Sequence, residues 1–305
     1  MTENASIRQR VRERAAKTGE SYPTARRHVV AEPRPATVVI AVAQTALRPD
    51  PRSRAQLRES GARVRELVRE AAGAGAALVQ FPEGALTSPH RRAMSGGGPG
   101  ADWPAVDRAA LAAELDAVAE TARELGIWVV AGGIDFAGDD PRPTNALFVI
   151  SAHGALAGRY DERMLSRTKT AFQYRAGTRP FVFEARGARF GCALGMETQY
   201  PELFSAYERA DVDCVLLSTA GNPEVPGGFV TDAAGHAAAN SFWVGYSGPA
   251  QAGEPPSGVL SPSGTWVARC APATEGIVVT VIDTALGDQA RSWRRAVRAA
   301  AAGHA

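Results

Sequence analysis

Two glutamates and one glycine stand at places in this chain where strands are expected to end and chemistry is usually positioned. Glu83 follows the apolar run 77–81, and Glu162 follows the run 156–160. A carboxylate in such a place can act as a general acid or base. Gly195 follows a third run, 189–194, at a strand-to-helix elbow of the kind that holds a nucleophilic side chain in α/β proteins. Glycine offers no nucleophile there.

The motifs around these residues resemble those of the nitrilase superfamily of carbon–nitrogen hydrolases. Residues 191–202 are similar to its nucleophile motif, G-x-x-x-C-x-[DE]-x-x-[FY]-P-E, with Gly195 in the place of the cysteine. The segment 81–83 resembles the one that carries the general-base glutamate, which corresponds to Glu83. The segment 159–165 resembles R-Y-x-K-x-x-L, where Glu162 replaces the catalytic lysine. The resemblance covers roughly residues 37–283 and leaves one catalytic position of three unchanged.

The resemblance implies acyl transfer, in which a thiolate attacks an amide or nitrile carbon, a glutamate moves protons and a lysine stabilises the oxyanion. With Gly195 and Glu162 in place, we expect a pseudoenzyme that binds a small molecule or a partner protein without classical hydrolysis. Loss of one oxyanion donor alone costs about 3–4 kcal/mol in catalysis. The alternative is an enzyme with repurposed chemistry on a small C–N compound, in which Glu83 and Glu162 serve as acid and base.

The expected pocket is rich in carboxylates. Two carboxylates a few ångströms apart resist double ionisation unless a cation joins them, so we expect a cationic ligand, a metal ion or a side chain such as Lys169 between Glu83 and Glu162. For Lys169 itself, a side chain exposed to solvent is the favoured interpretation. Cys192 is expected to be a buried core residue. Glycine at position 195 has a structural interpretation too, as relief of backbone strain at the elbow.

Three further residues are candidates for substrate binding. Met196 and Glu197 follow Gly195 directly, and Glu197 is expected near the floor of the pocket. Asp135, at the end of the run 127–134, is a loose match to a further acidic residue of the family. The histidines form no recognisable metal or triad pattern, and the three cysteines are widely spaced. No metal centre built on histidine or cysteine ligands and no cofactor are therefore expected.

Strand-like and helix-like segments alternate, with antiparallel hairpins near the end, and predict an α/β fold with two mixed sheets between helix layers. The resemblance implies the four-layer αββα sandwich and a homodimer or larger assembly. We expect a basic arm over 1–35, the nitrilase-like domain over 36–285 and a helical tail over 286–305. The expected strands are 36–43, 77–81, 127–134, 145–150, 156–160, 181–184, 189–194, 214–218, 242–246, 258–261, 265–269 and 277–282; the expected helices are 6–17, 23–28, 54–71, 105–125, 201–209, 230–240 and 289–301.

Charge and hydropathy exclude some classes of partner. The formal net charge is +2. Residues 1–35 hold eight Lys and Arg against four Asp and Glu, or +4, and leave −2 for the rest. We interpret this segment as a solvated arm in preference to a nucleic-acid-binding helix–turn–helix. No apolar run is long enough to cross a bilayer and no secretory leader is visible, so a cytoplasmic protein without a membrane partner is expected.

Overall fold

A computed structural model describes residues 2–18, 22, 25, 37–48, 50, 52–87, 102–136, 141–222, 227–285, 291, 293–294 and 297–298. The chain divides into two compact units, one of residues 38–282 and one of residues 1–37 and 283–305. In the smaller unit, helix α1 (Thr2–Thr18) confirms the helix expected over 6–17. The helix expected over 23–28, most of that over 289–301 and most of the loop 88–104 lie outside the described residues.

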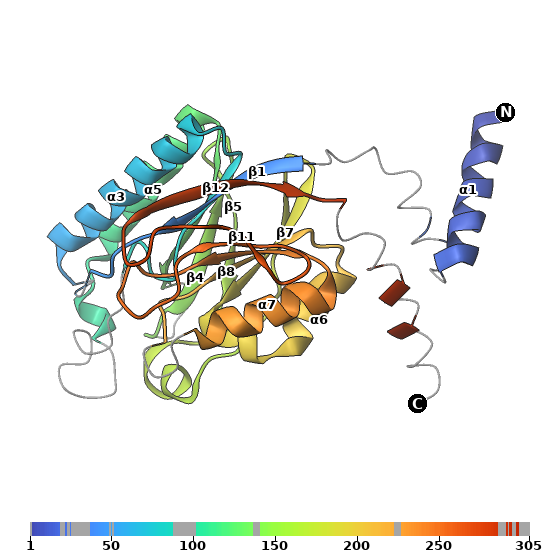
Figure 1. Cartoon of the computed structure of the whole chain (residues 1–305). Helices are drawn as coiled ribbons and strands as arrows, with labels where there is room; N and C mark the ends of the chain where they lie inside the picture. The colour runs from blue at the N-terminus through green and yellow to red at the C-terminus, as the bar shows by residue number, and fades with distance from the viewer. Residues whose placement is uncertain are drawn as a thin grey trace. The chain divides into compact units, whose positions relative to one another are not determined.

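The larger unit is built on two six-stranded mixed sheets (Figure 1). The first has the order β12-β1-β2-β3-β4-β5, with β1, β2 and β3 parallel and the hairpins antiparallel. The second has the order β11-β10-β9-β8-β7-β6, with β7, β8 and β9 parallel. The strands are β1 (Thr37–Gln44), β2 (Leu78–Gln80), β3 (Trp128–Asp135), β4 (Thr144–Ile150), β5 (Leu156–Asp161), β6 (Val182–Ala185), β7 (Ala188–Leu194), β8 (Cys214–Ser218), β9 (Trp243–Ser247), β10 (Gly258–Leu260), β11 (Trp266–Arg269) and β12 (Gly276–Asp283).

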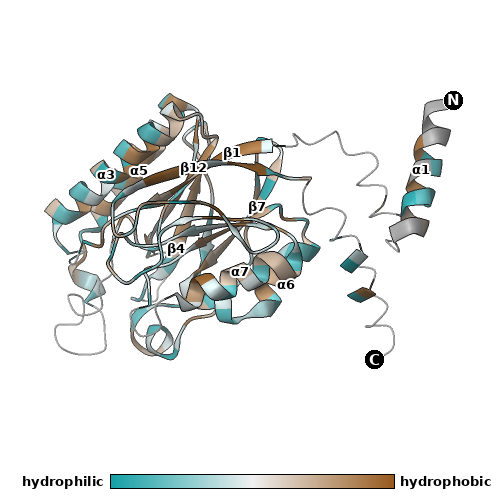
Figure 2. Ribbon diagram, viewed as in Figure 1, coloured by the Kyte–Doolittle hydropathy of each residue, from teal (hydrophilic) through white to brown (hydrophobic). Residues whose placement is uncertain are grey.

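Helices cover the outer face of each sheet, which gives the expected αββα sandwich (Figures 1 and 2). Helices α3 (Arg54–Gly73) and α5 (Arg108–Leu125) pack on the first sheet, and α6 (Pro201–Arg209) and α7 (Gly228–Asn240) on the second. The apolar residues form three clusters, one under each helix pair and one between the sheets. Alternation along the strands sends neighbouring side chains into different clusters, because successive strand residues face opposite sides.

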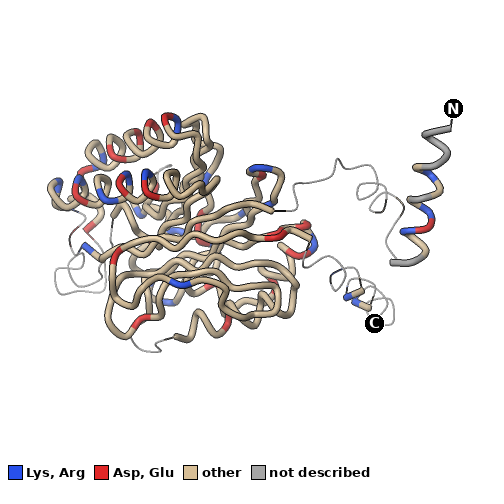
Figure 3. Tube along the Cα trace, turned by 45° about the horizontal axis from the view of Figure 1, so that its top comes forward, with Lys and Arg blue, Asp and Glu red and all other residues tan. Residues whose placement is uncertain are grey.

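Positively and negatively charged residues are interspersed along α3 and α5 (Figure 3). The two helices approach closely at Gly61, where a Cβ would collide with the Glu114 carboxylate, and Arg65 of α3 pairs with that same carboxylate. In the described part of the chain, no helix combines the length and the apolar character that a bilayer crossing requires.

Buried polar side chains tie the two sheets together where the parallel strands end. The amide of Gln80 in β2 donates to the carbonyls of Leu217 and Gly245 in the other sheet, at 2.8 and 3.1 Å. The hydroxyl of Ser218 donates to the carbonyl of Phe81 at 2.8 Å. These bonds hold the segment that leads to Glu83 against the second sheet. Open α/β sheets place their sites at this carboxyl edge of the strands.

Candidate functional site

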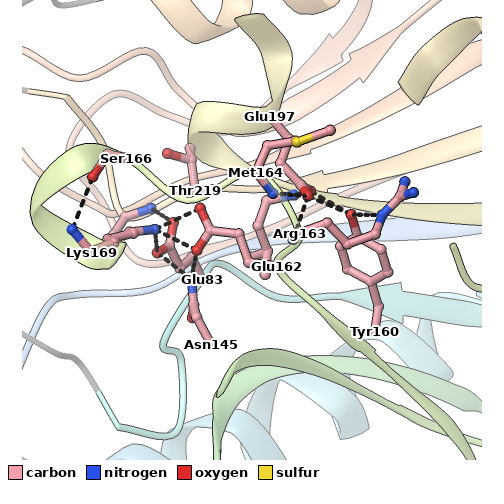
Figure 4. Close-up of polar contacts among 12 residues, drawn as sticks. Glu83, Asn145, Tyr160, Glu162, Arg163, Met164, Ser166, Lys169, Glu197 and Thr219 are labelled. Carbon is pink, nitrogen blue, oxygen red and sulfur yellow. Dashed lines mark hydrogen bonds and ion pairs between the residues drawn. The ribbon is translucent and has the colours of Figure 1, made fainter. Parts of the chain in front are cut away.

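Glu83 lies three residues beyond the end of β2 and is almost fully buried. Its Oε1 accepts hydrogen bonds from Lys169 Nζ and Asn145 Nδ2, each at 2.8 Å. Its Oε2 accepts from the backbone N–H of Ala220 at 3.0 Å, just past β8 of the other sheet. The carboxylate is thus held by three donors from three separate elements (Figure 4).

Glu162, directly after β5, is fully buried beside Glu83. Lys169 Nζ lies 2.9 Å from its Oε1 and 2.7 Å from its Oε2, and Asn145 Nδ2 donates to Oε2 at 2.6 Å. Burial raises the pKa of Glu162 to about 7; the Lys169 ammonium opposes that shift, and the neighbouring Glu83 and Glu197 carboxylates add to it. The single amide nitrogen of Asn145 therefore bridges the two glutamates.

Lys169 supplies the cation expected between these carboxylates. It opens a single π-helical turn, Lys169–Gln173, and the carbonyl at the end of that turn accepts a hydrogen bond from the Trp103 indole. Burial alone would lower the pKa of Lys169, but Glu162 and Glu83 outweigh it and raise that pKa. The expectation of a solvated Lys169 is wrong, because its side chain is 16% exposed and paired with both glutamates.

Gly195 opens a short 3₁₀ turn, Gly195–Gln199, between β7 and α6, and its missing side chain would face Glu83. A Cβ on Gly195 would lie 3.2 Å from Glu83 Oε2, 3.3 Å from Thr219 Oγ1 and 3.5 Å from the Phe229 ring. The φ angle of Gly195 lies outside the left-handed region, so other residues can adopt this backbone. The interpretation of Gly195 as relief of backbone strain is therefore wrong.

Cys192, three residues before Gly195, is buried in β7 in the cluster between the sheets, as expected. Burial raises the pKa of its thiol well above the ordinary value. The other two cysteines, Cys214 and Cys270, are free and buried as well. A thiol in such surroundings is a packing group and not a reactive thiolate.

Glu197 is fully buried, and its carboxylate is occupied by donors of the chain itself (Figure 4). The Tyr160 hydroxyl lies 2.6 Å from each of its oxygens, and the backbone N–H groups of Leu194 and Arg163 donate at 2.9 and 2.8 Å. Burial raises the pKa of Glu197, while these donors oppose the shift. Met196, beside it in the same turn, is partly buried.

Asp135, the last residue of β3, forms an ion pair with Arg159 at 2.6 Å. The same guanidinium binds Asp161 at 2.7 Å, and Thr144 also donates to Asp161. The fold thus brings Glu83, Glu162 and Gly195 together, whereas the described contacts of Asp135 are with arginines.

Sequence reasoning missed Asn145, Thr219 and Ala220. Asn145 is a fully buried amide in an otherwise apolar strand, and that pattern was the available signal, because a buried amide needs partners. Ala220 contributes only a backbone N–H, which leaves no mark in a sequence. Among the residues that the structure describes, no group of three or more His, Cys, Asp or Glu could hold a metal ion.

Comparisons with known proteins bear on this arrangement. Solved structures with similar folds include a cysteine-to-alanine mutant of the Nesterenkonia AN1 amidase from the nitrilase superfamily, at 19% identity and a TM-score of 0.69, which covers 90% of this chain and 100% of that one. The C. elegans NitFhit protein matches at 18% identity and a TM-score of 0.73, with 87% of this chain and 65% of that chain covered. No curated protein sequence matches significantly. The model of the carbon–nitrogen hydrolase family matches residues 39–293, most of the chain. The chain therefore belongs to the carbon–nitrogen hydrolase family and has the nitrilase-type fold.

Proposed function

We propose that this protein does not carry out cysteine-dependent hydrolysis of amides or nitriles and that it binds a small molecule at the site formed by Glu83, Glu162 and Gly195. One observation carries the proposal: the residue that directly faces Glu83 at the elbow is glycine. The nearest thiol, that of Cys192, is buried between the sheets. The proposal assigns Gly195 to the nucleophile's position, which leaves the covalent step without an attacking atom.

The state of Lys169 supports the same proposal. A lysine ammonium has three N–H donors, and Lys169 has three acceptors in reach, one on Glu83 and two on Glu162. An oxyanion at this place would have to displace one of these carboxylate oxygens. The ammonium is therefore committed to holding the two glutamates together.

In a glutamate-to-glutamine mutant of the amidase from Nesterenkonia sp. AN1, the acetamide moiety of fluoroacetamide is added covalently at the active-site cysteine. The test uses that reaction on this chain. The purified protein is incubated with fluoroacetamide and with a panel of amides, nitriles and N-carbamoyl compounds, and both product release and intact mass are measured. We expect neither turnover nor a covalent adduct, whether an alkyl adduct from fluoroacetamide or an acyl adduct from the other compounds. A trapped adduct on Cys192 or on any other residue of the site would refute the proposal.

A second candidate function is acid–base chemistry on a small C–N compound with Glu83 and Glu162 as the pair. The pKa of about 7 that burial gives Glu162 favours it, because a carboxyl group that titrates near neutral pH suits general acid catalysis. The same panel tests this candidate at several pH values. Turnover that disappears in Glu162→Gln, without an acyl adduct, would select it over the binding function.

We also propose that the protein is cytoplasmic and forms a homodimer or a larger homo-oligomer, without a nucleic-acid partner. The three buried free cysteines suit a reducing compartment. Light scattering on the purified protein measures the assembly, and a monomer at micromolar concentration would refute the homo-oligomer.

A further inference from the structure

Glu254 lies in the turn between β9 and β10, beside the loop that follows β8. Its carboxylate accepts a hydrogen bond from the backbone of Asn222. It packs against Gly221, whose φ is 85°, and a Cβ on Gly221 would lie only 2.7 Å from Glu254 Oε1. This glycine, with its left-handed backbone and absent side chain, allows the close approach of the carboxylate.

A short run of contacts joins Glu254 to the elbow. The N–H of Gly221 donates to Thr219 Oγ1 at 3.0 Å, and Thr219 Oγ1 lies 3.3 Å from the position of a Cβ on Gly195. These contacts and the covalent bonds between them span about 12 Å in all, so the Glu254 carboxylate lies no farther than that from the Cβ position on Gly195. Both groups are thus within the span of one small molecule.

Glu254 differs from Glu83 and Glu162 in its charged partners. Glu83 and Glu162 share the Lys169 ammonium. Burial raises the pKa of Glu254, and the opposing contribution comes from a backbone N–H, with none from a lysine or arginine in the described part of the chain. A half-buried carboxylate in this situation is stabilised by any cation that approaches it.

Within the described ranges, a second acceptor at the site also lacks a hydrogen-bond donor. The amide nitrogen of Asn145 is used by Glu83 and Glu162, whereas its Oδ1 is buried and finds no hydrogen-bond donor among the described residues. A buried acceptor of this kind costs free energy until a donor satisfies it. Asn145 and Glu254 therefore both favour a ligand rich in N–H donors, and an anionic ligand would be repelled by the Glu254 carboxylate.

We propose that the natural ligand of this site carries a cationic nitrogen, an ammonium or an amidinium, and that Glu254 is the residue that recognises it. The proposal rests on the proposed binding function and deepens it. It also changes the role of the two inner glutamates, because these already share the Lys169 ammonium and the ligand's cation pairs with the outer carboxylate.

The test compares probes that differ in one charge. Butyramide, 4-aminobutyramide and butyrate are titrated against the full-length protein at millimolar concentration by ligand-observed NMR. We expect 4-aminobutyramide to bind about 5- to 10-fold more tightly than butyramide, as one partly buried charge pair supplies about one factor of ten. Butyrate should bind most weakly.

The variant Glu254→Gln keeps the shape of the side chain and removes its charge, so it should abolish the preference for 4-aminobutyramide over butyramide. The control is Glu184→Gln in β6, whose side chain is 64% exposed. Glu184 pairs with Arg189 near the start of β7, whereas the elbow follows the end of that strand. If butyramide binds as well as 4-aminobutyramide, or if Glu254→Gln leaves the preference intact, the role of Glu254 is refuted while the binding function stands. If none of the three probes binds, both proposals fail.

Discussion

The hydroxyl of Tyr160 lies 2.6 Å from both carboxylate oxygens of Glu197, and it joins the end of β5 to the elbow that follows β7. The N–H of Arg163 donates to the same carboxylate. Glu162 lies between Tyr160 and Arg163 in the chain, and Gly195 lies two residues before Glu197. One buried carboxylate therefore sets the relative position of Glu162 and Gly195, and we interpret Glu197 as a positioning residue and not as a substrate-binding one.

The first prediction concerns the free energy that this contact contributes. Tyr160→Phe leaves the buried carboxylate short of one donor, so the free energy of unfolding should fall by about 1–3 kcal/mol. Glu197→Gln should cost more, because its NH₂ group replaces one of the two oxygens and so leaves either the Leu194 or the Arg163 N–H without an acceptor. Urea unfolding of each variant measures the change. Tyr200→Phe, a partly buried tyrosine of the same elbow, serves as the control and should leave stability unchanged. An equal loss in all three variants would remove the special role of Glu197.

The second prediction is that Glu162 and Lys169 can exchange charges. Glu162→Lys places two ammonium groups together, and Lys169→Glu places three carboxylates together, so each should lower the free energy of unfolding by about 3–5 kcal/mol. The double variant restores one cation between two carboxylates. Its loss should be smaller than the sum of the single losses by about 1–3 kcal/mol.

The same exchange on the exposed pair Glu120 and Arg123 of α5, whose side chains are 54% and 57% exposed, is the matched control. That pair should show no measurable coupling, because water screens it. If the loss of unfolding free energy in the Glu162 and Lys169 double variant equals the sum of the two single losses, their contact contributes nothing specific.

The third prediction follows from the pKa of Glu162, which rises from an ordinary 4.5 to about 7 in the folded state. Between these values the folded state holds a proton that the unfolded state has released. Stability contributed by Glu162 is therefore complete below about pH 4.5, falls as the pH rises to about 7, and is constant above it. Unfolding curves over this range should show a shallower decline in Glu162→Gln than in the unaltered protein. The raised pKa of Glu197 contributes with the same sign to both proteins. If the stability of Glu162→Gln and of the unaltered protein declines in parallel as the pH rises, the raised pKa of Glu162 is contradicted.

The fourth prediction concerns Gly195→Cys. The backbone tolerates the substitution, but the new Cβ would lie 3.2 Å from Glu83 Oε2 and requires a small adjustment. The variant should fold and place a thiol beside Glu83, yet acylate slowly, since Lys169 remains held by two carboxylates. Combining Gly195→Cys with the exchange of Glu162 and Lys169 should speed acylation by a simple amide such as butyramide, with release of ammonia, about 100-fold or more, which is the effect typical of one oxyanion donor. Intact-mass kinetics measure it. Equal rates in the single and combined variants would exclude a role for the lysine's position.

Periodicity and turn residues predicted most of the larger unit. Helix α6 and strand β8 have the expected bounds, Pro201–Arg209 and Cys214–Ser218, because Pro201 marks the first turn and the strand is apolar up to Ser218. Helix α5 begins at Arg108 and not at residue 105. The reason is local: Trp103–Ala105 forms its own 3₁₀ turn, and Asp107 caps the helix by accepting from the Ala110 N–H.

The polar cluster was only partly predictable. The strand ends placed Glu83 and Glu162 together, and the expected cation between them is present. Lys169 reaches it through a π-helical turn that is seated on Trp103, 70 residues earlier in the chain. A single π-helical turn has no periodicity to detect, and contacts at such separation depend on the whole fold. The lack of a hydrogen-bond donor for Asn145 Oδ1 among the described residues can likewise be recognised only when the positions of all nearby donors are known.

The place of β12 beside β1 has a consequence for synthesis on the ribosome. The chain completes β1 to β5 of the first sheet, then all of the second sheet, and returns only afterwards to cover the edge of β1. At roughly 5–20 residues per second, that edge stays unpaired for tens of seconds in the nascent chain. Open strand edges template aggregation, so we expect the nascent chain to be most prone to aggregate while this edge of the first sheet is unpaired.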